Sequence, residues 1–382
     1  MHQSCWQIWS DRGFLHHPNP FHTLRGLDTP LSTEITEHIE TLGKELTARL
    51  YDGTMRPTFD NLPIYDMTPL RELEGQFHII EHLMMRYGYF ANAYVYADPQ
   101  NPAQQLPSSI AIPLVQLSHM VERPPILTYA SYILSNWHLK DPNGDICIDN
   151  ADVIQSYCGG KDEAGFILIH MTMEAQAAPA LTGIQQACVS ALIGDISAVV
   201  DGLSKIPDSI QKMMNTFSRM TDACDADIYY HEIRPYLFGL NGIIYEGVDE
   251  FGGIPQNFRG QSGAQSSVIP ALVAGLGLEH EQSAMTHHLM VMRQYMPKPH
   301  RDFIAQMTHQ QVRPFVMKNR QNLALRDAYN TALVYLLKFR QLHLHFANAY
   351  VAQKVANPIG TGGTTFMDWL KQLADETQAQ LI

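Results

Sequence analysis

The chain has 382 residues, of which 45% are hydrophobic, and it carries a formal net charge of −12 at pH 7. A chain of this length and composition can bury a sizeable hydrophobic core. Nucleic-acid binding requires clustered positive charge, and this acidic sequence contains no run of Lys or Arg, so we expect no nucleic-acid partner.

Cysteine usage and apolar runs narrow the class further. Five cysteines, at positions 5, 147, 158, 188 and 224, show no CxxC spacing, so neither a disulfide framework nor a zinc site is predicted. The first residues, with His2, Trp6 and Asp11, do not resemble a signal peptide. The longest nearly uninterrupted apolar run, residues 268–278, is shorter than the roughly 18 residues that a bilayer crossing needs. We therefore predict a cytoplasmic protein without a membrane partner.

The first part of the chain mixes short helical patterns with Pro and Gly. The turn-rich stretch Lys140-Asp-Pro-Asn-Gly-Asp145 would interrupt either regular structure, so it is the best candidate for a domain boundary. We predict a smaller N-terminal domain, mixed but mostly helical, at residues 1–141, a linker at 142–150 and a larger, all-helical domain at 151–382.

Beyond this boundary, apolar residues recur at steps of three and four, which is the pattern of amphipathic helices. Alternating β-branched runs are scarce. The predicted fold class is therefore mainly α. Helical patterns cover residues 165–177, 182–204, 208–222, 226–238, 280–295, 300–318 and 322–353.

The long C-terminal helix carries the first candidate for chemistry. Steps of three and four place five of its residues on one stripe, namely Leu336, Phe339, His343, Ala347 and Tyr350. His343 therefore points inward, whereas His345 lies roughly 200 degrees further around the helix. An inward histidine needs a partner for each ring nitrogen, which an axial bond to haem iron could supply, although a hydrogen-bonded core histidine is the more common case.

Three further positions could belong to a site. Arg340 lies one turn before His343 and could pair with a haem propionate, or be a solvated arginine. His170 lies one turn after Phe166 and could face the iron from the other side, or pack in the core. Tyr229 and Tyr230 precede Arg234 by one turn, so this stretch could clamp an aromatic amino acid, with Arg234 gripping the carboxylate, or be an amphipathic helix with a salt bridge.

Two glycine-containing stretches, residues 259–267 and 360–364, predict loops whose backbone N–H groups can approach a ligand closely. Neither has the spacing of a nucleotide-binding loop. His280, His287 and His288 lie near Glu279 and Glu281, but no two of these histidines are three or four residues apart. We interpret this histidine group as a solvated face.

An ordered set of motifs resembles the indoleamine 2,3-dioxygenase family. In the family's order, and over about residues 100 to 375, these motifs are Leu106-Pro-Ser-Ser-Ile-Ala-Ile-Pro113, Gln116-Leu-Ser118, Pro124-Pro-Ile-Leu-Thr-Tyr-Ala130, Asn136-Trp137, Lys140-Asp-Pro-Asn143, Arg234-Pro-Tyr-Leu237, Tyr245-Glu-Gly-Val248, the Ser262 loop, Met292-Arg-Gln-Tyr-Met-Pro-Lys-Pro-His-Arg-Asp-Phe303, His343-Leu344 and Gly360-Thr-Gly-Gly-Thr364. The stretch at 292–303 is the most specific of them.

This resemblance implies roles for individual residues. His343 would be the proximal ligand of haem b, with Arg340 near it and the Ser262-Gly263 loop at the haem edge. Arg234 would hold the substrate carboxylate. The remaining implied substrate contacts are Tyr129, Phe166, Tyr229, Tyr230, Ser262, Gly263 and the loop threonine Thr361. His170 stands where many members carry a serine, and it resembles the distal histidine of the related tryptophan 2,3-dioxygenases.

The resemblance also implies a reaction. Haem and O₂ would open the indole C2=C3 bond of L-tryptophan or a related indole to give N-formylkynurenine, with His170 and Arg234 as the catalytic pair. The Tyr229-Tyr230 pair replaces two phenylalanines of the family, which leaves a haem oxygenase for a different aromatic substrate as one alternative. A non-catalytic haem-binding or sensor protein is another. The sequence leaves homo-oligomerisation open.

Overall fold

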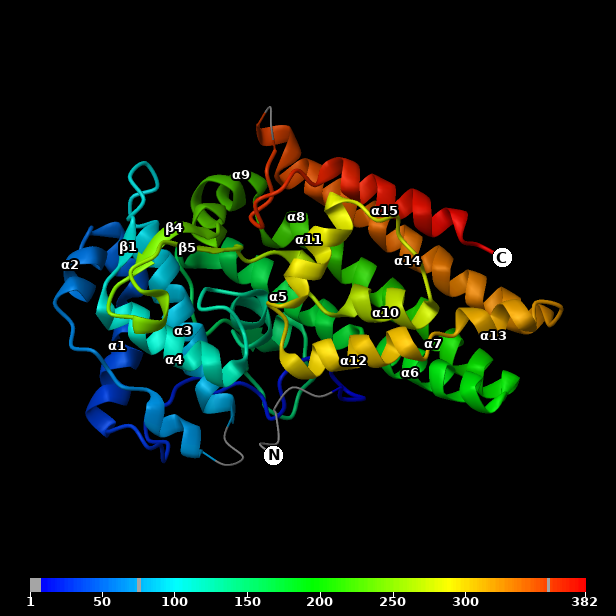
Figure 1. Cartoon of the computed structure of the whole chain (residues 1–382), viewed down its shortest axis with the longest axis horizontal. Helices are drawn as coiled ribbons and strands as arrows, with labels where there is room; N and C mark the ends of the chain where they lie inside the picture. The colour runs from blue at the N-terminus through cyan, green and yellow to red at the C-terminus, as the bar shows by residue number, and fades with distance from the viewer. Residues whose placement is uncertain (1–7, 74–76, 356–357) are drawn as a thin grey trace.

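The computed structural model describes residues 8–73, 77–355 and 358–382. Most of these residues lie in helices, which confirms the prediction of a mainly α fold (Figure 1). The α-helices of the first half are α1 (Thr33–Tyr51), α2 (Met55–Asp60), α3 (Phe77–Val95), α4 (Ser108–Val121), α5 (Gly160–Gln176) and α6 (Ala178–Ile193). Those of the second half are α7 (Ile196–Phe217), α8 (Met220–Ala223), α9 (Ala226–Ile228), α10 (Val268–Leu276), α11 (Ala284–Arg293), α12 (Lys298–His309), α13 (Arg313–Lys318), α14 (Leu323–Tyr350) and α15 (Met367–Ala379).

Short strands tie distant parts of the chain together. Strand β4 (Leu240–Tyr245) pairs in parallel with β1 (Gln105–Leu106) and antiparallel with β5 (Gln256–Phe258). A second pair joins β2 (His138–Leu139) to β3 (Ala151–Asp152). Figure 1 shows β1, β4 and β5 beside α3 and α4, far from the helices at the opposite end.

The helices from α5 onward form the larger bundle. Helix α7 packs against α5, α6 and α14, and α14 also packs against α15, with which it runs side by side in Figure 1. Helix α14 begins where the Asn322 side chain accepts a hydrogen bond from the backbone N–H of Leu325, which satisfies one of the free donors of its first turn. This helix agrees closely with the expected 322–353.

The prediction of a single helix at residues 182–204 was wrong. Helix α6 ends at Ile193, and the capping residue Gly194 has a φ of 80°, the left-handed conformation that glycine tolerates best. The Asp195 side chain then caps the next helix by accepting from the N–H of Ala198. Helix α7 continues through most of the expected 208–222 segment, so two segments predicted separately share one helix.

Other expected boundaries also differ. The helix that carries His170 begins at Gly160 instead of near Gly165. The segment 226–238 is not one α-helix, because α9 is followed by a π-helical turn, η4 (Tyr229–Ile233), and a 3₁₀ turn, η5 (Arg234–Leu237). Pro235, which lacks a backbone N–H, stands at the change between these turns. The 280–295 segment begins only at Ala284, and 300–318 is divided between α12 and α13.

The expected linker at 142–150 is a loop closed at its base by the β2–β3 pair and by a bond from the N–H of Lys140 to the carbonyl of Asn150. Contacts also cross the proposed boundary, since Asn92 donates to the carbonyl oxygens of Tyr236 and Phe238 at 2.8 and 3.1 Å. The division into domains at 1–141 and 151–382 stays a prediction. The expectation that residues 151–382 are all-helical is wrong, because β3, β4 and β5 lie within them.

Two expectations from composition concern absences. Among the residues that the structure describes, no helix has both the length and the apolar character needed to traverse a lipid bilayer. The described cysteines, Cys147, Cys158, Cys188 and Cys224, are free, and Cys5 lies outside the described residues. The cytoplasmic location stays a prediction.

Candidate functional site

His343 lies on α14, near its C-terminal end. Neither of its ring nitrogens has a hydrogen-bond partner within the described part of the chain, and its side chain keeps some exposed surface. Burial, followed by the nearby His170 and Arg340, lowers its pKa to about 4. The imidazole is therefore neutral at pH 7, with a free lone pair available to a ligand or metal.

His170 comes from a different helix, α5, and Phe217 at the end of α7 connects the two histidines. The Phe217 ring centroid lies 6.1 Å from that of His170 and 6.2 Å from that of His343. Nδ1 of His170 lies 2.8 Å from the carbonyl oxygen of Phe166 and must donate to it, which leaves Nε2 as an acceptor. Burial lowers the pKa of His170, so this imidazole is also neutral.

Aromatic rings extend the site away from His343. Phe166 contacts His170 with a centroid distance of 4.4 Å and stacks on Tyr229 at 4.7 Å. Tyr129 stands edge-on to His170 at 6.4 Å. The three predicted wall residues Tyr129, Phe166 and Tyr229 therefore do come together around His170. We call His343, Phe217, His170, Phe166, Tyr229 and Tyr129 the two-histidine site.

Arg234 follows η4 and is buried, with 5% of its surface exposed. Its guanidinium lies 5.2 Å from the ring centroid of Tyr230 and 4.7 Å from that of Phe238. It donates to the carbonyl oxygen of Ile359, and within the described residues it has no carboxylate partner. A buried guanidinium held only by rings and a carbonyl keeps donors for an anionic ligand.

Two loops meet beside Arg234. The Ser262 side chain accepts from the N–H of Ala264 and starts a 3₁₀ turn, η7 (Gly263–Gln265). Thr361 donates to the carbonyl oxygen of Gln261. A Cβ atom at Gly260 would lie only 2.5 Å from the carbonyl oxygen of Thr361, so this close approach requires glycine. The structure thus brings Ser262, Gly263 and Thr361 into one loop pair.

Arg340, expected beside a cofactor, is turned toward α15. It donates to the carbonyl oxygen of Leu373, and a second nitrogen lies 3.2 Å from Nε2 of His280. Burial lowers the pKa of Arg340 to about 10, and Glu376 opposes that change. Its predicted role at a propionate stays a prediction.

The structure corrects the expectation that His280, His287 and His288 form a solvated face. The interpretation as a solvated face holds for His287 and is wrong for two others, because His280 is bound 2.5 Å from Glu376 and the buried His288 packs on Trp369. His280 and His288 instead tie neighbouring segments to α15. Among the described residues, no cluster of His, Cys, Asp and Glu could hold a metal ion.

Sequence reasoning missed three residues around the site. Phe217 ends a helix whose pattern gave no reason to single it out. Gln265 accepts from the backbone N–H of Tyr129 at 2.8 Å and donates to the carbonyl of Gly260, so it fixes the loop to the wall. Glu174 bonds both Tyr129 and Ser266. The last could have been found, because Phe166, His170 and Glu174 are spaced by four on one helix.

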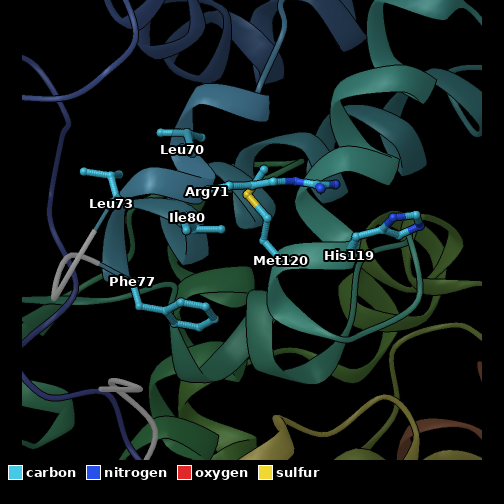
Figure 2. Close-up of a pocket in the computed structure, with 7 residues that line it drawn as sticks. All are labelled: Leu70, Arg71, Leu73, Phe77, Ile80, His119 and Met120. Atoms are coloured by element: carbon cyan, nitrogen blue, oxygen red, sulfur yellow. The ribbon is translucent and has the colours of Figure 1, made fainter. Parts of the chain in front are cut away.

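A separate pocket lies in the first half of the chain, between η1 (Thr68–Glu72) and the end of α4, with a volume of about 390 Å³ (Figure 2). Figure 2 shows Met120 below Arg71, with His119 to the right and Leu73, Ile80 and Phe77 to the left. The His119 ring is bonded to Glu250 at 2.9 Å. None of its lining residues belongs to the two-histidine site.

These features define a class of protein. A neutral histidine without a hydrogen-bond partner, surrounded by aromatic rings in a helical bundle and accompanied by a second histidine, is typical of helical proteins that bind haem.

Comparison with known proteins names the family. The sequence model of the indoleamine 2,3-dioxygenase family matches residues 2–358, which includes the first hundred residues and ends before Gly360. Indoleamine 2,3-dioxygenase 1 of Rattus norvegicus is 32% identical, over 89% of this chain and 88% of that protein. Indoleamine 2,3-dioxygenase 2 of Homo sapiens is 31% identical, over 79% of each chain. A 6-hydroxytryptophan 2,3-dioxygenase of Fusarium equiseti is 27% identical, over 92% and 93%. The chain belongs to the indoleamine 2,3-dioxygenase family, and it is a dioxygenase.

Proposed function

We propose that the protein binds haem b through His343 and uses it to add O₂ across the indole C2=C3 bond of L-tryptophan or a related indole, giving N-formylkynurenine. The observation that carries the proposal is His343 itself. A neutral imidazole with no other partner is the form that ligates iron, and the rings of Phe217 and Phe339 beside it suit a flat apolar macrocycle. The residues present therefore fit haem. When bound, haem supplies the O₂ and one-electron chemistry that amino-acid side chains lack.

His170 supports an indole as the substrate. Because Nδ1 donates to the carbonyl of Phe166, Nε2 can only accept, and it has no partner among the described residues. An indole N–H is a donor that would satisfy it. We propose that His170 orients the ring by this hydrogen bond, while Phe166 and Tyr129 hold the ring plane and exclude water.

Arg234 supports an amino acid. Its remaining N–H groups can form a bidentate pair with a substrate carboxylate, and burial makes that pair stronger than it would be in water. The bond from Arg234 to Ile359 connects it to the segment that carries Thr361. We propose that this segment and the Ser262-Gly263 loop line the same end of the substrate site.

Tyr229 favours a second candidate, oxygenation of a ring-hydroxylated indole. Its hydroxyl group has no hydrogen-bond partner within the described residues, and its ring stacks on Phe166. A hydroxyl group on the indole could bond to it, since a pocket built to bond a hydroxyl group favours a ligand that carries one.

The activity test uses purified, haem-loaded protein in the ferrous state with ¹⁸O₂. With L-tryptophan, we expect N-formylkynurenine that carries two ¹⁸O atoms, detected by mass spectrometry. A hydroxyindole amino acid run in parallel tests the second candidate by comparison of kcat/KM. Incorporation of a single ¹⁸O atom, or no ring-opened product from either compound, would contradict the proposed reaction.

The role of His170 is tested with a substrate that lacks the indole donor. We expect 1-methyl-L-tryptophan to lose about tenfold or more in kcat/KM against L-tryptophan, because Nε2 would be left unpaired. In His170→Ser the ratio between these two substrates should shrink. An unchanged ratio would mean that His170 does not contact the indole nitrogen.

A further inference from the structure

Glu174 is a buried carboxyl on α5, one turn beyond His170, with 3% of its surface exposed. Its Oε1 atom accepts hydrogen bonds from the hydroxyl groups of Tyr129, at 3.0 Å, and Ser266, at 2.6 Å. One oxygen atom therefore joins a wall of the two-histidine site to the loop that follows Ser262 and Gly263.

The other oxygen of Glu174 is in a different position. Oε2 is buried and has no hydrogen-bond partner among the described residues. Burial raises the pKa of the carboxyl to about 7, and the hydroxyl groups of Ser266 and Tyr129 partly oppose this. The titratable neighbours are Tyr129 and, one turn earlier on α5, the neutral His170. No charged side chain of the described residues contributes to this pKa.

Ionisation of this carboxyl would have a structural consequence. Both donors already bond to Oε1, so the charge shared by Oε2 would be buried without a donor or a cation, which is costly. Ionisation therefore favours the entry of water beside Oε2. The neutral acid also has no partner for its Oε2 hydroxyl among the described residues, but an unpaired hydroxyl costs far less to bury than a charge, so the neutral acid keeps both hydrogen bonds at Oε1 without drawing in water.

We propose that Glu174 is a positioning residue that, in its neutral form, holds Tyr129 and the Ser266 loop together around the substrate, so that substrate affinity falls when the carboxyl ionises. The inference rests on the proposed function, because it takes the two-histidine site to be the substrate site. Glu174 acts through Tyr129 and Ser266 and need not touch the substrate.

The same helix offers a matched control. Glu163 lies at the start of α5, is fully buried, and has a pKa that burial likewise raises to about 7. Both of its oxygen atoms accept backbone N–H groups, from Tyr157 and Cys158. Glu163 therefore titrates in a similar range without bonding Tyr129 or the Ser266 loop.

The experiment measures the dissociation constant of L-tryptophan by calorimetry on haem-loaded protein between pH 6 and pH 8.5. For wild type we expect about 30-fold weaker binding at pH 8.5 than at pH 6, since loss of one proton near pH 7 costs tenfold per pH unit above it. Glu174→Gln should bind with nearly constant affinity over this range. Glu163→Gln should keep the wild-type profile.

Circular dichroism would reveal whether Glu174→Gln folds. If it does not, a milder variant, Ser266→Ala, still tests the proposal. Ser266→Ala removes one donor that lowers the carboxyl pKa, so the midpoint of the affinity profile should move to higher pH. A flat wild-type profile, a profile retained in Glu174→Gln, or an unmoved midpoint in Ser266→Ala would overturn the inference. Complete absence of tryptophan binding would overturn it together with the proposed substrate.

Failure of the two proposals can be told apart. Tryptophan that binds with the expected pH profile but is never opened would contradict the proposed reaction and leave the role of Glu174 intact. Turnover with an affinity that does not change with pH would overturn the role of Glu174 alone.

Discussion

Two histidine groups in this protein are built in opposite ways. Between α1 and α3, both ring nitrogens of His82 are bonded, Nε2 to Glu40 at 2.7 Å and Nδ1 to the carbonyl of Phe21 at 3.2 Å. Arg86 adds a bond to the second oxygen of Glu40 at 2.7 Å and another to Gln155. Glu40, His82, Arg86 and Gln155, which we call the α1–α3 cluster, leave little capacity for a ligand.

The two-histidine site has the reverse arrangement. Within the described parts of the chain His343 forms no hydrogen bond, and His170 has one ring nitrogen bonded and one open. Histidines of both groups are covered by protein, His82 almost fully and His170 and His343 partly, so burial alone does not separate structure from function. The difference lies in unused bonding capacity, which is costly unless a ligand satisfies it. We therefore expect changes in the α1–α3 cluster to alter stability, and changes in the two-histidine site to alter binding and turnover.

The largest expected effect comes from His343→Ala. Loss of the axial nitrogen should abolish normal haem binding and lower turnover by more than about 100-fold, because even residues that only support a metal ligand are worth about 10-fold to 100-fold. The Soret absorption of the purified protein and the rate of product formation measure this. His345→Ala, an exposed histidine two positions on, is the control and should behave as wild type. Equal loss in both variants would remove His343 from the site.

Glu40→Ala should have the next largest effect, on stability. It leaves Arg86 and His82 buried without their carboxylate, which should lower the free energy of unfolding by about 3–5 kcal/mol in urea titrations. Glu45→Ala, on the same helix, removes a partly exposed partner of Arg49 and should cost less than about 1 kcal/mol. A small change in Glu40→Ala would contradict the structural role of the α1–α3 cluster.

Lowering the pH should produce the smallest and most gradual effect, a loss of stability spread over several pH units. The pKa of Glu40 is lowered from 4.5 to about 2 mainly by His82 and Arg86, against the opposing effect of burial, so its stabilisation is complete above about pH 4.5 and is lost as pH falls toward 2. Burial lowers the pKa of His82 below 6.5, so the unfolded chain takes up this proton first and stability falls below pH 6.5.

Each of these protons contributes a slope of at most about 1.4 kcal/mol per pH unit. Urea titrations at several pH values measure how the free energy of unfolding changes with pH, in wild type and in Glu40→Gln. The variant should lose less stability between pH 4.5 and pH 2 than wild type does. Parallel profiles for the two proteins would mean that Glu40 has no lowered pKa.

The helices that sequence reasoning located well are those with local signals. Residues 322–353 showed an unbroken apolar stripe, and α14 occupies nearly the same range after the Asn322 cap. The error at 182–204 arose because apolar spacing continues across Gly194 and Asp195, whose left-handed turn and cap end one helix and begin the next. Periodicity reports which face is apolar, and it does not report where the chain reverses.

The positions of side chains around the candidate site were harder to predict from the sequence. The inward direction of His343 follows from helical spacing, and its proposed role came from the resemblance to a family. The turn of Arg340 toward α15 did not follow, because nothing within α14 indicates that Leu373 and His280 cover that face. Gln265 went unnoticed for the same reason, since Tyr129, from whose N–H it accepts a hydrogen bond, lies 136 residues away. Glu174 could have been singled out by its spacing from Phe166 and His170, but its bond to Ser266, 92 residues away, does not follow from the helix alone.

The sequence by itself determined a mainly α protein of this family, with His343 and His170 facing inward, because helical periodicity and ordered motifs are properties of the chain. Only the tertiary structure decided that Phe217 connects these histidines, that Nε2 of His170 is the open acceptor, and that Glu174 joins Tyr129 to the Ser266 loop. Unused bonding capacity depends on every group that packs around a side chain, and those groups come from segments far apart in the sequence.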